Sequence, residues 1–203
     1  MSRGPAILAS TLLFAAAVRA DSVVLDNAYV RVSRNTAPCA AGAAACGDRV
    51  LVALGEVQLA GRKAGPLSRG QVAVFRRGEA HAPPAGEFLE VAFKPDRPRV
   101  EGPPVRIAPE KNELLYDGEA FFVFEEKLRP GETRSRHSHA QRVVVVINDT
   151  QLRQWPDGAP EVLRQQVPDD VHFNQPVVHV VKNVGANPLR NIVLELKPAP
   201  SPR

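Results

Sequence analysis

The sequence predicts an all-β protein, and three observations carry that prediction. The 203 residues include 19 prolines and 14 glycines, spread so widely that they interrupt nearly every candidate helix. Short apolar segments recur between Gly, Pro and Asn turns, as expected for a β-sandwich or β-barrel. Segments of the first half return in the same order in the second half. The composition, 44% hydrophobic and 24% charged, is that of an ordinary globular protein.

The first half of the chain is expected to contain a series of short strands. Apolar segments between turn residues mark four stretches: 26–33, 48–59, 71–76 and 87–94. We expect the second stretch to form two short strands around a Gly-Glu turn. The five prolines between residues 95 and 109 are typical of a linker.

The second half repeats this plan. A Phe-rich strand is expected at 119–128, then a Pro-Gly turn, and later an apolar strand at 141–147. Three pairs of segments correspond in order: 48–54 with 141–147, 58–59 with 151–152, and 91–95 with 194–198. The correspondence indicates a duplicated unit of roughly 90 to 100 residues. It predicts two domains, at 21–96 and 110–203, joined by a linker at 97–109.

The first 20 residues have the pattern of a secretory signal peptide. A positive charge at Arg3 precedes an apolar run at 6–18, and residues 18–20 offer a cleavage site. An N-terminal membrane anchor is the alternative, but this run of about 13 residues is shorter than the roughly 20 that a spanning helix needs. We therefore predict an exported protein, periplasmic or secreted, that starts at Asp21 and has no membrane span.

Charge says little about partners. The formal net charge of +4 falls to +2 without residues 1–20, because Arg3 and Arg19 leave and no acidic residue does. No dense run of Lys and Arg interleaved with aromatic residues marks a nucleic-acid surface. We predict no nucleic-acid partner.

The two cysteines, Cys39 and Cys46, flank a small Ala/Gly loop. In an exported protein, a disulfide between them is the default expectation. A thiolate metal site or a reactive thiol is the alternative.

Two histidines, His137 and His139, follow the Pro-Gly turn and are two positions apart. Side chains at i and i+2 of a strand point to the same face, so both imidazoles can project into one interior. His179 lies in a later apolar strand and can join them as a third metal ligand. The alternatives are a surface pair on a loop and, for His179, an ordinary core histidine. Asn183, four positions after His179, is expected to be a turn residue.

These residues resemble the motifs of the cupin superfamily. Gly131, five further residues, His137 and His139 fit its first motif, and His179 with Asn183 fits the end of its second motif. The Pro-x-Gly that usually precedes the last histidine is absent. The resemblance covers nearly all of the predicted mature chain and implies a bicupin, with two tandem jelly-roll barrels of six to eight strands each.

The first repeat departs from the family pattern. Gly70, Gly78 and His81 keep the spacing of the second motif, but Ala44 and Cys46 stand where the second repeat has its paired histidines. The resemblance therefore implies that the metal motif survives in the second barrel alone.

The second repeat lacks the carboxylate that the family usually adds, because Val143 and Val144 stand at its position. The implied site has three neutral imidazoles, which suit a divalent Fe, Mn, Ni, Cu or Zn ion and favour an anionic ligand. Glu125, Glu126 and His172 are the candidates for a fourth ligand or for an acid/base group.

Three arginines flank this region: Arg134, Arg136 and Arg142. One of them is a candidate for a bidentate contact to an anionic substrate, and a solvated rim is the alternative. We expect a small-molecule ligand and consider two functions. The sequence leaves open whether the protein forms a homo-oligomer. The first function is dioxygenase or isomerase chemistry on a small organic acid. The second is non-catalytic binding of a ligand or a partner protein, with both barrels serving only to stabilise a dimer as a further variant. Catalytic residues are not assigned.

Overall fold

The computed structural model describes residues 22–37, 47–61, 65–98 and 111–199. Within these ranges the protein is all-β, with fourteen strands in three sheets, which confirms the predicted fold class. Cys39 and Cys46 lie outside the described residues, as do the predicted signal peptide and most of the predicted linker. The disulfide and export therefore remain predictions.

The first half of the chain forms one five-stranded antiparallel sheet. Its strands are β1 (Ser22–Asp26), β2 (Val30–Arg34), β3 (Arg49–Gln58), β4 (Val72–Phe75) and β5 (Ala85–Phe93), in the order β1-β2-β5-β3-β4. The prediction of two strands at 48–59 is wrong, because β3 is a single strand of ten residues. Its pairing with β5 shifts register between Ala53 and Val57, so an irregularity at the Gly-Glu position bends the strand instead of ending it.

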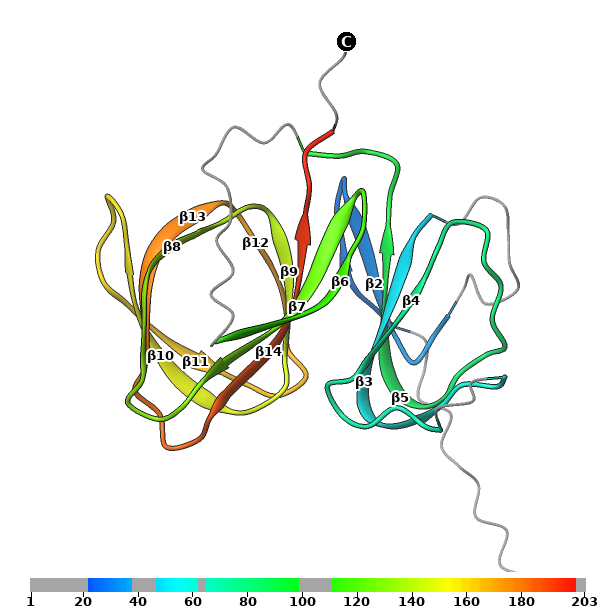
Figure 1. The fold of residues 1–203 in the computed structure, drawn as a ribbon, viewed down its shortest axis with the longest axis horizontal. Helices are drawn as coiled ribbons and strands as arrows, with labels where there is room; N and C mark the ends of the chain where they lie inside the picture. Colours follow the sequence, from blue (N-terminus) through cyan, green and yellow to red (C-terminus); the bar gives the residue numbers. More distant parts are fainter. Residues whose placement is uncertain (1–21, 38–46, 62–64, 99–110, 200–203) are drawn as a thin grey trace, which may run out of the picture.

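The second half forms a barrel from two sheets (Figure 1). The strands are β6 (Asn112–Asp117), β7 (Phe121–Leu128), β8 (Thr133–His139), β9 (Arg142–Val146), β10 (Thr150–Pro156), β11 (Val162–Gln166), β12 (Val171–Asn174), β13 (Val177–Asn183) and β14 (Leu189–Leu196). One sheet has the order β12-β9-β14-β7-β6 and the other β11-β10-β13-β8.

Strand order repeats between the two five-stranded sheets. Read from the opposite edge, the second is β6-β7-β14-β9-β12, so β2 corresponds to β7, β3 to β9 and β5 to β14. The predicted residue correspondence also holds in the pairing, because Val50 faces Val91 in the first sheet and Val143 faces Leu194 in the second. Among the described residues, the four-stranded sheet belongs to the second unit alone.

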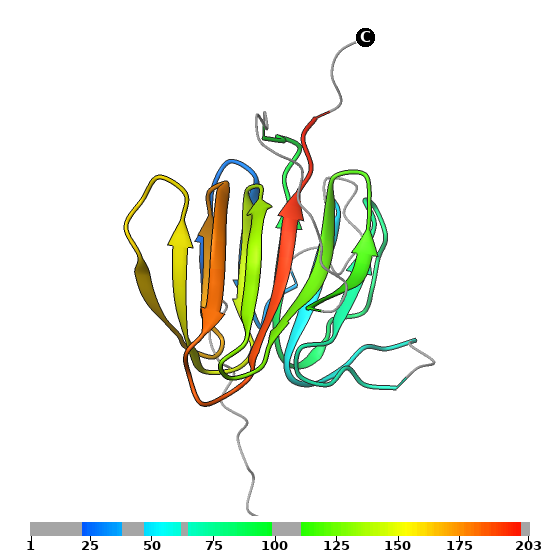
Figure 2. The same cartoon turned by 60° about the vertical axis from the view of Figure 1, so that its left-hand side comes forward.

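An apolar layer lies between the two five-stranded sheets, which pack face to face. Sixteen buried residues from both units form one cluster, and Phe93 of the first unit stacks on Phe121 of the second with 3.8 Å between the ring centroids. Figure 2 shows the strands of both units running side by side. The two units therefore share a hydrophobic core that lies outside the second barrel.

The other face of the second unit's five-stranded sheet lines the barrel interior. Because side chains alternate along a strand, Val143 and Val145 of β9 enter the shared core, whereas Arg142 and Val144 face the interior. The described residues include no helix long and apolar enough to span a membrane.

Candidate metal centre

The turn before β8 fixes where the first two histidines lie. The backbone N–H of Glu132 donates to the carbonyl of Arg129 over 3.0 Å, closing a four-residue turn with Gly131 at its third position. Gly131 has φ of 78°, which a residue with a side chain rarely adopts. Its N–H donates to the carbonyl of Asn183 at the end of β13, so the turn ties β8 to the strand that carries His179.

Three imidazoles converge at one end of the barrel interior. His137 and His139 lie on β8, and His179 lies on β13 directly opposite His137. Nε2 of His137 is 3.0 Å from Nε2 of His139 and 3.1 Å from Nε2 of His179. The candidate ligand atoms of all three rings lie within 4.8 Å of one another. The structure thus brings together the three predicted ligands.

Hydrogen bonds to the far side of two rings leave their Nε2 atoms without protons. Nδ1 of His137 is 2.8 Å from the carbonyl of Ser135, and Nδ1 of His139 is 3.0 Å from Oε2 of Glu195. A carbonyl accepts hydrogen bonds, and so does the ionised carboxylate of Glu195, so with Glu195 ionised the proton of each neutral ring sits on Nδ1. Two bare Nε2 lone pairs then face each other at 3.0 Å. A divalent cation between them would turn this repulsion into coordination, so the residues fit a metal.

The charge state of the rings also fits metal binding. Burial lowers the pKa of His137, and it lowers the pKa of His139 well below the usual value. Burial, followed by the charges of His137 and Arg142, lowers the pKa of His179 to about 3. All three rings are therefore neutral near pH 7, which is the form that ligates metals.

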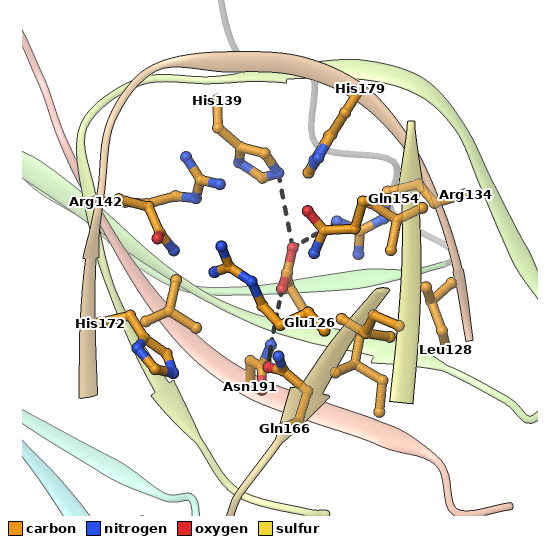
Figure 3. Close-up of a pocket in the computed structure, with 16 residues that line it drawn as sticks. Glu126, Leu128, Arg134, His139, Arg142, Gln154, Gln166, His172, His179 and Asn191 are labelled. Carbon is orange, nitrogen blue, oxygen red and sulfur yellow. Dashed lines mark hydrogen bonds and ion pairs between the residues drawn. The ribbon is translucent and has the colours of Figure 1, made fainter. Parts of the chain in front are cut away.

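Two carboxylates stand near His139 although positions 143 and 144 hold valine. Glu195, fully buried on β14, contacts Nδ1 of His139 and accepts the N–H of Ala140. Glu126 on β7 lies on the other side, with Oε1 3.7 Å from Nε2 of His139 (Figure 3). The carboxylates thus come from β7 and β14 and not from the positions that follow the paired histidines.

Glu126 is ionised despite its burial. Burial alone would raise its pKa, but the charges of Arg134 and Arg142, with hydrogen bonds from Arg134 and Asn191, outweigh it and lower the pKa. Burial raises the pKa of Glu195 to about 7, because the N–H of Ala140 and the charge of Arg142 offset it only in part. The two carboxylates beside His139 therefore differ in proton affinity.

A register shift in the pairing of β8 with β13 decides which arginines face the cavity. His137 pairs with His179 but Arg134 pairs with Val181, so one extra residue is accommodated on β8 between them. Arg134 consequently lines the same cavity as His139. Arg136 is exposed and forms an ion pair with Asp157, so the structure does not bring it to the site.

Arg142 lines the cavity, but it also has a counterpart in the first unit. Its Nη1 donates to the carbonyls of Ala140, two residues earlier, and of Gln175. At the corresponding position of β3, the guanidinium of Arg49 donates to the backbone carbonyl of Gly47, two residues earlier, and to that of Glu79. Both guanidiniums are buried. Arg142 and Arg49 thus play the same structural role in the two units: each holds a neighbouring loop to its strand through backbone carbonyls.

The remaining predicted residues fall into two groups. Glu126 and His172 line the cavity. Glu125 alternates to the opposite face of β7, where it pairs with Lys127 and Arg190. Asn183 is not the expected turn residue but the buried last residue of β13, and its amide makes hydrogen bonds with Thr150, Gly185, Leu128 and Asn187.

Sequence reasoning missed several polar residues that line the cavity: Gln154, Arg164, Gln166, Asn174 and Asn191. It also missed Glu195. A signal existed for Glu195, because this charged residue interrupts the apolar run of residues 192–196. An acid inside a buried strand requires a partner.

No protein-family model matches the chain, and no curated protein matches it either. The solved structures that match it include two that cover nearly its whole length. AerE from Microcystis aeruginosa has a TM-score of 0.54 and 13% sequence identity, covering 87% of this chain and 97% of that one. A cupin 2 conserved barrel domain protein from Leptotrichia buccalis has a TM-score of 0.51 and 13% identity, covering 88% of both chains. At this identity the likeness shows the fold alone, which is that of a cupin-type β-barrel protein.

Proposed function

We propose that this protein of the cupin fold binds one divalent cation through His137, His139 and His179. The observation that carries the proposal is the convergence of three Nε2 atoms, two of them bare and only 3.0 Å apart. Three nitrogen ligands from one side leave coordination positions open for water or a small molecule, as in catalytic metal sites.

A bound Zn²⁺, Fe²⁺, Mn²⁺, Ni²⁺ or Cu²⁺ would supply Lewis acidity, and the redox-active ions would add oxygen chemistry. The chain's own residues prepare the site for it. Glu195 holds the proton on Nδ1 of His139 and orients the ring. Glu126 supplies an ionised carboxylate beside Nε2 of His139.

The ligand that best suits this site is small and anionic. The three neutral imidazoles themselves add no negative charge to the cation, and Arg134, Arg142 and Arg164 line the adjoining cavity. If the site is catalytic, isomerase or dioxygenase chemistry on a small organic acid fits these features. Export of the protein, predicted from residues 1–20, is part of the same proposal.

Non-catalytic binding is the second candidate. It is favoured by the state of Glu126, which is held by Arg134 at 2.7 Å and by Asn191 at 3.3 Å and so is poorly placed to act as a base. In this version the metal and the cavity bind a ligand without converting it.

Metal analysis tests the proposal. The full chain is produced without a histidine tag, and bound metals are measured by mass spectrometry in the wild type, in His137→Ala and in the matched control His81→Gln. We expect about one equivalent of metal in the wild type and the control, and a loss of at least tenfold in His137→Ala. Fe, Mn, Ni or Cu would favour oxygen chemistry, and Zn an isomerising, hydrolytic or structural role. No metal in the wild type, even after reconstitution, would refute the proposal.

A further inference from the structure

We propose that the cavity beside the three histidines binds a small hydroxycarboxylic acid, whose carboxylate is held by Arg164 and whose hydroxyl donates to Asn191. The proposal rests on the proposed function at one end of the cavity, where the histidines would hold the metal. It makes Arg164 and Asn191 specificity-determining residues.

The cavity lies in the barrel interior, next to the histidines, and is small. Its free volume is about 40 Å³, enough for about three water molecules. Figure 3 shows the polar side chains that point into it from strands of both sheets. Eleven polar or charged side chains form most of the lining: Glu126, Arg134, His139, Arg142, Gln154, Arg164, Gln166, His172, Asn174, His179 and Asn191. A ligand here is compact and polar.

The charged residues that line the cavity favour an anionic ligand. Arg134 is compensated by Glu126, whose Oε1 lies 2.7 Å from its Nη1. Arg142 is buried and makes hydrogen bonds to two carbonyls, but it forms no ion pair with any described residue. Burial lowers the pKa of Arg142 even though the charges of Glu126 and Glu195 act to raise it, which reflects the cost of holding this cation away from water. An anion in the cavity would offset that cost.

Arg164 is the arginine that remains available to such an anion. It lies on β11, the edge strand of the four-stranded sheet, opposite Leu152 of β10. Within the described ranges its guanidinium has neither a hydrogen bond nor an ion pair, although it lines the cavity. Arg164 as a whole is exposed to solvent. A guanidinium placed between cavity and solvent can receive a carboxylate through two parallel hydrogen bonds.

Buried polar atoms without hydrogen-bond partners in the cavity indicate that the ligand also carries a hydroxyl. Nε of Arg134 is a buried donor and Oδ1 of Asn191 a buried acceptor, and neither has a partner among the described residues. The orientation of the Asn191 amide is fixed, because its Nδ2 faces Glu126 Oε2 at 3.3 Å and Gln166 Oε1 at 3.5 Å. A carboxylate can only accept hydrogen bonds, so it would leave Oδ1 unpaired. A hydroxyl donates to it.

Matched probes test both halves of the proposal. Glycolate, acetate and ethylene glycol are titrated calorimetrically into metal-loaded protein, since all three have two carbons but only glycolate has both a carboxylate and a hydroxyl. We expect glycolate to bind at least tenfold more tightly than either of the others. Arg164→Gln should weaken glycolate at least tenfold and leave the metal content unchanged. Arg153→Gln, which removes a neighbouring exposed arginine paired with Glu161, should change nothing.

The variant Asn191→Leu tests the contribution of the ligand's hydroxyl to binding separately from that of its carboxylate. In a variant that retains the wild-type circular dichroism spectrum, glycolate should lose its advantage over acetate, while acetate binding stays within about threefold. If this variant does not fold, the comparison of glycolate with acetate in the wild type decides the same point.

The outcomes distinguish this inference from the proposed function. Normal metal content with glycolate binding no better than acetate, or unchanged in Arg164→Gln, would overturn the inference and leave the metal site intact. Absence of metal would refute the proposed function, and titration of the metal-free protein would then decide the cavity: glycolate binding that depends on Arg164 supports the inference, and no binding overturns it.

Discussion

Nδ1 of His139 lies 3.0 Å from Oε2 of Glu195, a carboxylate with no solvent exposure. The other oxygen of Glu195 accepts the N–H of Ala140, so the carboxylate bridges the ring and the backbone that follows it. This contact fixes the tautomer of His139 and aims Nε2 at the other two imidazoles. Glu195 is therefore expected to act on the metal through His139.

Glu195→Gln should weaken metal affinity by about 10- to 100-fold, because outer carboxylates that orient a ligating histidine have effects of this size. Metal affinity is measured by competition with a chromophoric chelator. The exposed Glu56→Gln serves as the matched control. An unchanged affinity in a folded Glu195→Gln protein would show that the orientation of His139 does not depend on this carboxylate.

Arg142 and Arg49 should act as structural anchors of the two units. Replacing either by methionine leaves the backbone carbonyls that it contacts without a buried donor, and we expect a loss of about 2–4 kcal/mol in the free energy of unfolding. Denaturant titration of Arg142→Met and Arg49→Met measures it, with exposed Arg136→Met as control. A stable Arg142→Met variant that loses only ligand binding would contradict the anchoring role.

Glu90 should make the first unit less stable as the pH rises. Burial, partly opposed by Arg49, raises its pKa from 4.5 to about 7, and His81 Nε2 faces it at 3.6 Å. The folded state thus binds the proton more tightly than the unfolded state, so this contribution to stability is present below about pH 4.5 and is lost as the pH rises to 7.

The test is the difference in the free energy of unfolding between Glu90→Gln and the wild type, measured at several pH values. It should shift in favour of the variant between pH 5 and pH 8, by at most about 3 kcal/mol. Glu56→Gln should show no such trend. A difference that is constant, or that grows toward acid, would disprove the raised pKa.

The stacking of Phe93 on Phe121 should couple the two units. Phe121→Ala opens a cavity in the shared core, and we expect a loss of about 3–5 kcal/mol. The single tryptophan, Trp155, reports on the second unit, whereas circular dichroism reports on both. The two signals should give one coincident transition in the wild type. Separate transitions in the wild type would show that the shared core does not couple the units.

The sequence predicted the three histidines because their signal is local. The i, i+2 spacing on a strand places His137 and His139 on one face, and an apolar strand around His179 predicts a buried ring. The same alternation could have separated Glu126 from Glu125, which lie on opposite faces of β7. It could not have placed Arg134, because the register shift in β8 breaks the alternation between Arg134 and His137.

The sequence by itself determined the all-β class, the duplicated order of strands and the residues of the histidine cluster, since each follows from spacing between near neighbours in the chain. Only the tertiary structure decided which carboxylates and arginines surround that cluster. Glu126, Arg164 and Glu195 reach the barrel interior from β7, β11 and β14, and their meeting depends on which strands pair and in what register. Pairing over such sequence distances is set by the packing of whole sheets, which no local pattern encodes.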